Sequence, residues 1–305
     1  MPDPSGTIES PLRVGVEVMN ESTARCAVLI EGDLKADFGY VRSAIGTGFI
    51  GSMASESVRG LYHNYIITCA HVIRPQIDRG APIDVRVRSV DRRLMSIRVN
   101  DWFFPENAGI DLAVAEFQAG IDPHGPDGTF IFNINGVVID DSDHAITDEN
   151  AGELQLGAPV VYAGLLAPMQ QMALVGEPMV RSGSIGALYV PNIAYETYDF
   201  TGHLIDCRSY GGFSGSPIFV NFQRMAQQRE PDGRLTLLLL TEIRLFGMLT
   251  GHLTDHLPPS ADDDGVHARF GIGSVLPIGT IRKFIMKRFE EDRARRNADW
   301  KNENS

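Results

Sequence analysis

Three short segments of the chain contain the residue types that nucleophilic catalysis needs. In chain order they are residues 66–72 with His71, residues 111–115 beginning at Asp111, and residues 211–217 with Ser214. A serine hydroxyl is a weak nucleophile until a base removes its proton, and histidine is the most common base. Taken singly, each segment has an ordinary structural explanation, as a strand end, a turn before an apolar run, or a tight glycine turn. The chemistry therefore requires all three segments to meet in space.

Together and in this order, the segments resemble the signatures of the trypsin-like (chymotrypsin-fold) serine peptidases. Those signatures are Thr-Ala-Ala-His, Asp-Ile/Leu-Ala and Gly-x-Ser-Gly-Gly/Ser-Pro; this chain has Thr-Cys-Ala-His, Asp-Leu-Ala and Gly-Phe-Ser-Gly-Ser-Pro. Residues 157–164, 180–185 and 247–250 resemble strands of that family's second barrel, and residues 271–284 its final strand and helix, especially in bacterial Deg-type peptidases. The resemblance covers roughly residues 20–290 and implies an all-β fold of two six-stranded antiparallel β-barrels with a C-terminal helix. The PDZ domain that Deg-type peptidases append is not expected, because too little chain follows Ser214.

The resemblance implies a serine endopeptidase that hydrolyses peptide bonds through an acyl-enzyme. His71 is expected to act as base and then as acid, Asp111 to orient its ring, and Ser214 to attack the substrate carbonyl. The backbone amides of Gly212 and Ser214 are expected to form the oxyanion hole. Since these groups supply the proton transfers and the charge stabilisation, we expect no metal and no organic cofactor, and a protein or peptide substrate as the partner.

Four further residues are expected to lie around the substrate. Thr250 stands where the family has a hydroxyl residue near the buried aspartate, and Gly251 and His252 stand at positions that pair with the substrate backbone. Arg208 stands near the floor of the first specificity pocket, where a cation favours acidic side chains. Arg208 can equally pair with Asp206 and turn outward, so the sequence leaves the cleavage specificity open.

Two residues depart from the family pattern. Phe213 precedes the nucleophile where the digestive enzymes have an aspartate that pairs with a newly freed N-terminus, so activation by that ion pair is not expected. Cys69 replaces an alanine of the histidine motif. We expect Cys69 to be a small buried core residue that points away from His71.

Two other functions remain open on the sequence alone. One is a chymotrypsin-fold protein without activity, kept for binding, because a sequence does not show whether the oxyanion loop is competent. The other is an α/β-hydrolase esterase, in which His252, His256 or His267 would serve as the base. The order of residues and the missing second glycine of the Gly-x-Ser-x-Gly motif count against the esterase.

Short apolar runs of strand length, bounded by turn residues, dominate the rest of the chain. They cover residues 26–30, 48–50, 65–69, 85–90, 112–117, 159–162, 184–190, 216–220, 235–241 and 245–250. Helical blocks do not separate them, which favours a barrel or sandwich over a doubly wound sheet. One amphipathic helix is predicted near the C-terminus, with Thr280 as its cap and Ile281, Phe284, Ile285 and Phe289 on its apolar face.

These patterns predict an N-terminal arm over residues 1–20, a peptidase domain over 21–290 and a charged tail over 291–305. The two barrels are expected at about 21–145 and 146–290. Residues 189–202 have no counterpart in the family and are expected to form a cleft-side loop or an insertion.

Composition indicates which partners and which cell compartment to expect. A net charge of −12 disfavours nucleic acid and anionic membranes as partners, and no apolar stretch of transmembrane length is present. Three scattered cysteines and the absence of a signal-peptide pattern predict a cytoplasmic protein that folds without disulfides. The acidic clusters at 140–143 and 262–264 lack the spacing of a calcium loop and are expected to be exposed loop residues.

Overall fold

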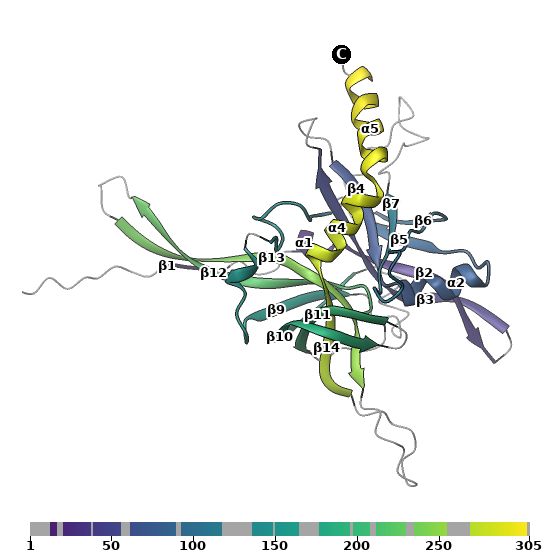
Figure 1. Cartoon of the computed structure of the whole chain (residues 1–305), viewed down its shortest axis with the longest axis horizontal. Helices are drawn as coiled ribbons and strands as arrows, with labels where there is room; N and C mark the ends of the chain where they lie inside the picture. Colours follow the sequence, from purple (N-terminus) through teal and green to yellow (C-terminus); the bar gives the residue numbers. More distant parts are fainter. Residues whose placement is uncertain are drawn as a thin grey trace, which may run out of the picture.

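The computed structural model describes residues 13–16, 21–37, 39–55, 62–89, 93–117, 136–148, 150–164, 177–195, 198–207, 212–229, 235–254 and 269–303. Two β-sheets dominate the molecule, and a pair of consecutive helices rises from the body at the C-terminal end (Figure 1). Every apolar run predicted as a strand overlaps a strand of the structure. The predicted all-β class is therefore confirmed.

The first sheet is formed by residues 27–117 together with one short later strand. Its order is β6-β5-β2-β3-β4-β7, and β8 pairs with β3 in parallel. The strands are β2 (Ala27–Ala36), β3 (Gly39–Ala54), β4 (Tyr62–Thr68), β5 (Asp84–Arg88), β6 (Leu94–Arg98), β7 (Ala113–Phe117) and β8 (Val137–Val138).

This first sheet has the six strands that were predicted on its main path, and they form a half-barrel. Within the described residues no ladder joins β6 to β7. The strand β6 has only five residues, and the chain then continues irregularly to β7. A single bridge between Phe103 and Val114 takes the place of a ladder, with N–O distances of 2.8 and 2.9 Å.

The second sheet does close into a six-stranded barrel, as predicted. Its ring runs β13-β12-β9-β10-β11-β14 and is completed by pairing of β13 with β14. The strands are β9 (Pro159–Gly164), β10 (Met179–Tyr195), β11 (Tyr198–Cys207), β12 (Pro217–Arg229), β13 (Leu235–Thr254) and β14 (Arg269–Pro277). Apart from two short parallel pairs, β1–β13 and β3–β8, the described ladders are antiparallel, unlike the sheet of an α/β-hydrolase.

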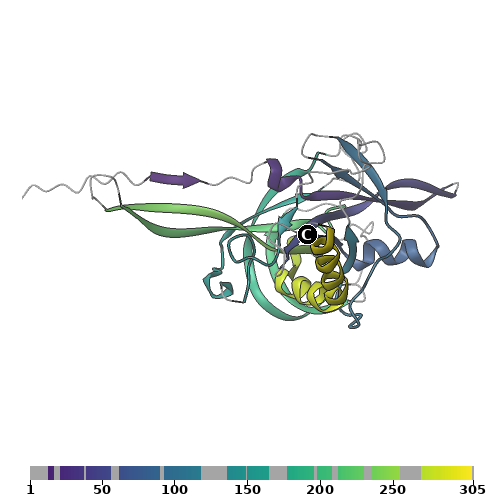
Figure 2. The same cartoon turned by 90° about the horizontal axis from the view of Figure 1, so that it is seen from above.

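The strands β12 and β13 extend beyond the barrel as a long two-stranded arm (Figures 1 and 2). A strand from the N-terminal region, β1 (Arg13–Val16), pairs in parallel with residues 238–241 of this arm. Part of the segment predicted to be a loose N-terminal arm is therefore held in a sheet.

Helix α4 (Ile278–Arg288) is the amphipathic helix predicted near the C-terminus. Ile281, Ile285 and Phe289 are buried as expected. The predicted cap is wrong, because the helix begins at Ile278, after Pro277, and Thr280 lies inside its first turn. The other helical elements of the described residues are α1 (Glu21–Ala24), α2 (Ala70–Asp78), the 3₁₀ turn η1 (Ala151–Glu153) and α5 (Glu290–Glu303). No described helix is long and apolar enough to cross a membrane.

Helix α5 occupies most of the segment that was predicted to be a charged, solvated tail. Arg293 ties α5 to α4 by donating to the carbonyl oxygens of Ile285 and Met286 at 3.1 and 3.0 Å. Asn297 accepts a hydrogen bond from Ser55 Oγ at 2.7 Å, and Arg296 forms an ion pair with Glu116 of β7. The two helices thus link the second barrel, against which α4 packs, to the first sheet.

A buried histidine lies in the core of the second barrel. The His203 ring stacks on Phe246 with centroids 4.6 Å apart, and the ring of Tyr189 meets its edge at 4.7 Å. The backbone N–H of Tyr189 donates to His203 Nδ1 at 3.1 Å. Burial lowers the pKa of His203 to about 4.

This histidine should make the fold sensitive to mild acid. Between pH about 6.5 and 4 the unfolded chain binds a proton at His203 and the folded protein does not, so the free energy of unfolding should fall as the pH falls through this window. The limiting slope for one proton is about 1.4 kcal/mol per pH unit. Urea unfolding of the wild type and His203→Asn at pH 7, 6 and 5 checks this, since asparagine keeps an acceptor but does not titrate. An equal pH dependence in the two proteins would contradict it.

Candidate active site

The histidine of the predicted triad lies on a helix, not at a simple strand end. Strand β4 ends at Thr68, Cys69 is the extended N-cap residue (φ −78°, ψ 142°), and helix α2 begins at Ala70. His71 therefore lies in the first turn of α2. The buried residues Val72, Ile73 and Gln76 have helical spacing, a signal that the sequence reading missed.

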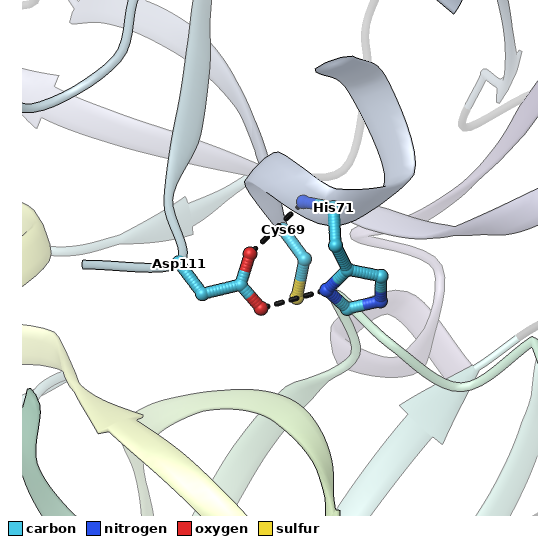
Figure 3. A group of neighbouring side chains, drawn as sticks. All are labelled: Cys69, His71 and Asp111. Carbon is cyan, nitrogen blue, oxygen red and sulfur yellow. Dashed lines mark hydrogen bonds and ion pairs between the residues drawn. The ribbon is translucent and has the colours of Figure 1, made fainter. Parts of the chain in front are cut away.

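Two hydrogen bonds join His71 directly to Asp111 (Figure 3). His71 Nδ1 lies 2.7 Å from Asp111 Oδ2, and the backbone N–H of His71 donates to Asp111 Oδ1 at 3.0 Å. Asp111 is fully buried, while 18% of the His71 side chain is exposed. Because an ionised carboxylate can only accept, Nδ1 carries the ring proton in the neutral imidazole, which leaves the lone pair on Nε2.

The loop that precedes Asp111 is held from the opposite barrel. The backbone N–H of Asp199 in β11 donates to the carbonyl oxygen of Gly109 at 2.9 Å. A Cβ atom on Gly109 would lie 2.7 Å from the backbone carbonyl oxygen of Asp199, so only glycine lets the two backbones come this close. The described residues between 189 and 202, for which the family offers no counterpart, thus belong to the paired strands β10 and β11, and β11 contacts the loop carrying Asp111.

Ser214 lies on a turn that is fixed between the two sheets. Gly212 and Gly215 have φ values of 100° and 90°, a region that glycine adopts without strain. Thr47 of β3 donates from its backbone N–H to the Ser214 carbonyl oxygen at 3.0 Å and from Oγ1 to the Gly212 carbonyl oxygen at 2.7 Å. On the other side, the N–H of Gly215 donates to the Leu249 carbonyl oxygen at 2.8 Å.

The same stretch of β3 supports both the serine turn and the histidine helix. A Cβ atom on Gly46 would lie 2.8 Å from Val72 Cγ1 and 3.5 Å from the Ser214 carbonyl oxygen. Val72 of helix α2 and the backbone of Ser214 therefore both lie close to Gly46. This arrangement places the serine turn next to the start of α2, as the predicted triad requires.

Phe213 anchors the serine turn in the second barrel. Its side chain is fully buried, and its ring meets Tyr162 edge to face at a centroid distance of 5.7 Å. A Cβ atom on Gly164 would lie 2.4 Å from Phe213 Cδ1, so Phe213 fills the space above this glycine. Apolar packing therefore holds the position at which the digestive enzymes form an ion pair.

The structure describes three of the four residues that were expected around the substrate. Thr250 is buried, and its Oγ1 donates to the Ser274 carbonyl oxygen at 3.1 Å and lies 2.8 Å from Ser274 Oγ. Its hydroxyl is thus engaged by Ser274 of β14, and its place around the substrate stays a prediction. Gly251 and His252 form part of the β13–β14 ladder, and Arg208 lies outside the described residues.

Cys69 lies beside His71 and Asp111, which corrects the expectation that it points away from His71 (Figure 3). Its Sγ and the side-chain ligand atoms of His71 and Asp111 all lie within 4.8 Å of one another. The extended backbone of the N-cap residue directs the side chain inward, where Sγ donates to the Leu249 carbonyl oxygen at 3.4 Å. Burial and the adjacent charge of Asp111 raise the pKa of the thiol well above its usual value, so it is neutral.

Among the described residues, Cys69, His71 and Asp111 are the one group whose donor atoms converge closely enough for a metal ion. Thiolate, imidazole and carboxylate are ligands that zinc accepts. However, two ligands of one tetrahedral zinc ion, each at about 2.0 Å, lie roughly 3.3 Å apart. The 2.7 Å separation of Nδ1 and Oδ2 and the neutral thiol fit a hydrogen-bonded cluster better than a metal site.

Two aspartates of the first acidic cluster accept hydrogen bonds from protein groups. Asp141 accepts from the backbone N–H of Asp143 at 2.8 Å and lies 3.2 Å from His144 Nδ1. Asp140 accepts from the backbone N–H of Ala54 at 3.1 Å, and partial burial raises its pKa, so it is not a fully exposed loop residue as predicted. The second cluster, residues 262–264, lies outside the described residues.

Comparison with known proteins yields similarity in structure only. No family model and no curated protein matches the chain. Among solved structures, the crystal structure of Deg5 matches at 15% identity over 88% of this chain and 91% of that chain, with a TM-score of 0.48. The apo MamO protease domain from Magnetospirillum magneticum matches at 16% identity over 72% of this chain and 93% of that domain, with a TM-score of 0.41. The assignment of a chymotrypsin-type fold rests on the strand topology and on the geometry described above.

Proposed function

We propose that this protein is a serine endopeptidase in which Ser214 is the nucleophile, His71 the general base and acid, and Asp111 the group that orients His71. The observation that carries the proposal is the bond of 2.7 Å between His71 Nδ1 and the fully buried carboxylate of Asp111, beside a serine turn fixed by Thr47. A carboxylate beside Nδ1 keeps the ring proton on that nitrogen. The lone pair of Nε2 is then free to accept the serine proton, as a general base must.

In this mechanism Ser214 Oγ bonds to the carbonyl carbon of the scissile peptide while its proton passes to His71 Nε2. The backbone N–H groups of Gly212 and Ser214 stabilise the oxyanion of the tetrahedral intermediate. The C–N bond then breaks, and Nε2 returns the proton to the leaving amine. A water molecule, deprotonated by His71, releases the acyl group and regenerates Ser214.

The proposal is tested by incubating the purified protein with a random peptide library and sequencing the new termini by mass spectrometry. We expect internal cleavage with a defined residue preference, and no such cleavage by Ser214→Ala prepared in parallel. If the two preparations produce the same termini, the cleavage comes from a contaminant. A folded wild-type protein that cleaves nothing supports the alternative, a chymotrypsin-fold binding protein without activity.

Removal of metal ions is expected to leave the activity unchanged. His71 supplies the proton transfers and backbone amides supply the charge stabilisation, so no step requires a Lewis acid. Hydrolysis of a library-derived peptide is measured before and after dialysis against EDTA, and again after addition of Zn²⁺. Loss of activity on chelation, with recovery on adding the metal, would contradict this prediction.

Activity should not require a specific new N-terminus. The buried Phe213 side chain cannot pair with a freed α-amino group, and burying an ammonium without a partner costs several kcal/mol, about 3 or more. We therefore expect the chain starting at Met1 to be active, or to be switched by a partner or ligand. Comparing it with chains trimmed at successive sites between Met1 and Cys26 checks this. The prediction is wrong if one trimmed form alone is active and acetylation of its N-terminus removes the activity.

A further inference from the structure

Thr47 of the first sheet bonds twice to the serine turn of the second. It lies in β3 and is fully buried. Its backbone N–H donates to the Ser214 carbonyl oxygen at 3.0 Å, and its Oγ1 donates to the Gly212 carbonyl oxygen at 2.7 Å. The two bonds therefore hold the turn on both sides of Phe213. Any residue except proline can supply the first bond, whereas the second needs a hydroxyl at position 47.

The position of Thr47 is itself fixed by its neighbours. Oγ1 of Thr68, the last residue of β4, donates to the Thr47 carbonyl oxygen at 2.7 Å. A Cβ atom on Gly215 would lie 1.8 Å from the same oxygen, so the serine turn packs directly against β3 at this point. Thr47 is thus held by β4 and by the turn, and its hydroxyl reaches Gly212 from a fixed place.

The two anchored carbonyl groups enclose the donors of the proposed oxyanion hole. The N–H of Ser214 belongs to the peptide group between Phe213 and Ser214, which lies between the two anchors. The N–H of Gly212 adjoins the first anchor, and the φ of 100° at Gly212 sets its direction relative to the anchored carbonyl. Glycine adopts many other φ values at little cost, so the anchor matters here. Among the described residues, no backbone carbonyl accepts a hydrogen bond from either N–H, as an oxyanion hole requires.

A purely structural role for the hydroxyl can be distinguished from a catalytic one. A buried threonine hydroxyl needs a partner, and a backbone carbonyl often provides it. Such a role affects stability alone. Thr68 has that kind of bond, since its acceptor is a carbonyl group of its own sheet. The acceptor of the Thr47 hydroxyl is instead a glycine of the oxyanion loop, on the other sheet.

We propose that Thr47 is a positioning residue whose hydroxyl, through the Gly212 carbonyl group, keeps the oxyanion hole in its competent conformation. This inference rests on the proposed function for its catalytic meaning, but the anchoring can be tested without activity. Without the hydroxyl, the Gly212 backbone can rotate and turn its N–H away from the substrate carbonyl. The bonds between His71 and Asp111 do not involve Thr47, so the basicity of His71 should not change.

The anchoring is tested by NMR on wild type, Thr47→Val and Thr47→Ser. Isotope labels on the glycine carbonyl carbons and the phenylalanine amide nitrogens select the Gly–Phe peptide bonds, which the chain has at residues 48–49 and 212–213. We expect the Gly212 carbonyl signal to move to lower frequency in Thr47→Val, because it loses a donor, and to return towards the wild-type position in Thr47→Ser. The pH titration of the His71 ring should be the same in all three. Thr47→Ala, which also lacks the hydroxyl, is the second variant if Thr47→Val does not fold.

The matched control is Thr68→Val. It removes a hydroxyl that is equally buried and that donates to a backbone carbonyl at the same 2.7 Å, but it leaves the bond to Gly212 in place. The rate of reaction with a fluorophosphonate probe is measured on all the proteins at neutral pH. We expect Thr47→Val to react about 10- to 100-fold more slowly than wild type, which is at most the cost of losing one oxyanion donor. Thr47→Ser and Thr68→Val should stay within about threefold of wild type.

Four results would overturn the inference: an unmoved Gly212 carbonyl signal in Thr47→Val, an unchanged rate in that variant, an equal loss of rate in Thr68→Val, or an altered titration of His71. If the wild type does not react with the probe but the Gly212 signal moves as expected, the anchoring by Thr47 stands and the proposed peptidase activity fails.

Discussion

Replacing Ser214 with alanine is expected to lower the turnover of a peptide substrate by a factor of about 10⁶. The side chain contributes the oxygen atom that bonds to the substrate carbonyl carbon. Without it, the peptide bond can be hydrolysed only by a different mechanism. His71→Ala should cost about as much, because an unactivated serine hydroxyl is a weak nucleophile. Turnover is measured at a fixed saturating concentration of a peptide taken from the library experiment.

Folding must be shown to be intact in both variants. The serine turn is held by backbone contacts with Thr47 and Leu249, which Ser214→Ala retains. The thermal unfolding midpoint of Ser214→Ala should therefore stay close to that of wild type, whereas His71→Ala removes a donor from the buried Asp111 and is compared under conditions where it is still folded. A folded Ser214→Ala protein with wild-type turnover would move the chemistry to another residue.

The second large effect is expected at Asp111. Asp111→Asn keeps the size of the side chain but presents an amide where Oδ2 now faces His71 Nδ1 at 2.7 Å. If the amide N–H faces Nδ1, the ring proton moves to Nε2, and Ser214 loses its base. We expect turnover to fall about 10⁴-fold, less than for loss of the nucleophile.

The pH dependence of turnover distinguishes a change of the His71 tautomer from a loss of structure in Asp111→Asn. Asp111→Asn should recover part of its activity at alkaline pH, where hydroxide can remove the serine proton without His71. The control is Asp141→Asn, an exposed aspartate that also faces a histidine ring nitrogen, at 3.2 Å, but lies outside the proposed site. A loss of similar size in the Asp141 variant, or a loss below tenfold in Asp111→Asn, would contradict the proposed role.

The sequence was most informative where the chemistry depends on short local motifs. The apolar runs mark the strands because turn residues bound them. The His motif follows the end of β4, and the Asp and Ser motifs precede the starts of β7 and β12. The closed second barrel follows from strands that pair over long registers, such as β12 with β13. The first sheet stays a half-barrel, because no ladder joins β6 to β7 among the described residues.

Features that depend on distant contacts were not predictable in the same way. The charges of α5 are mixed in sign and indicate solvent exposure, yet Asn297 and Arg296 dock the helix on the first sheet. The direction of the Cys69 side chain depends on the extended N-cap geometry that precedes α2. The resemblance places the Thr250 hydroxyl near the buried aspartate, but it does not indicate the partner Ser274, which comes from another strand.

The most direct test of the central claim is reaction of the wild-type protein with a fluorophosphonate probe, followed by peptide mapping of the adduct. The probe forms a covalent bond with a serine oxygen only when a neighbouring base activates it. We predict one adduct per chain, located on Ser214, and no adduct in folded His71→Ala. A folded wild-type protein that gives no adduct, or an adduct on another residue, would contradict the account.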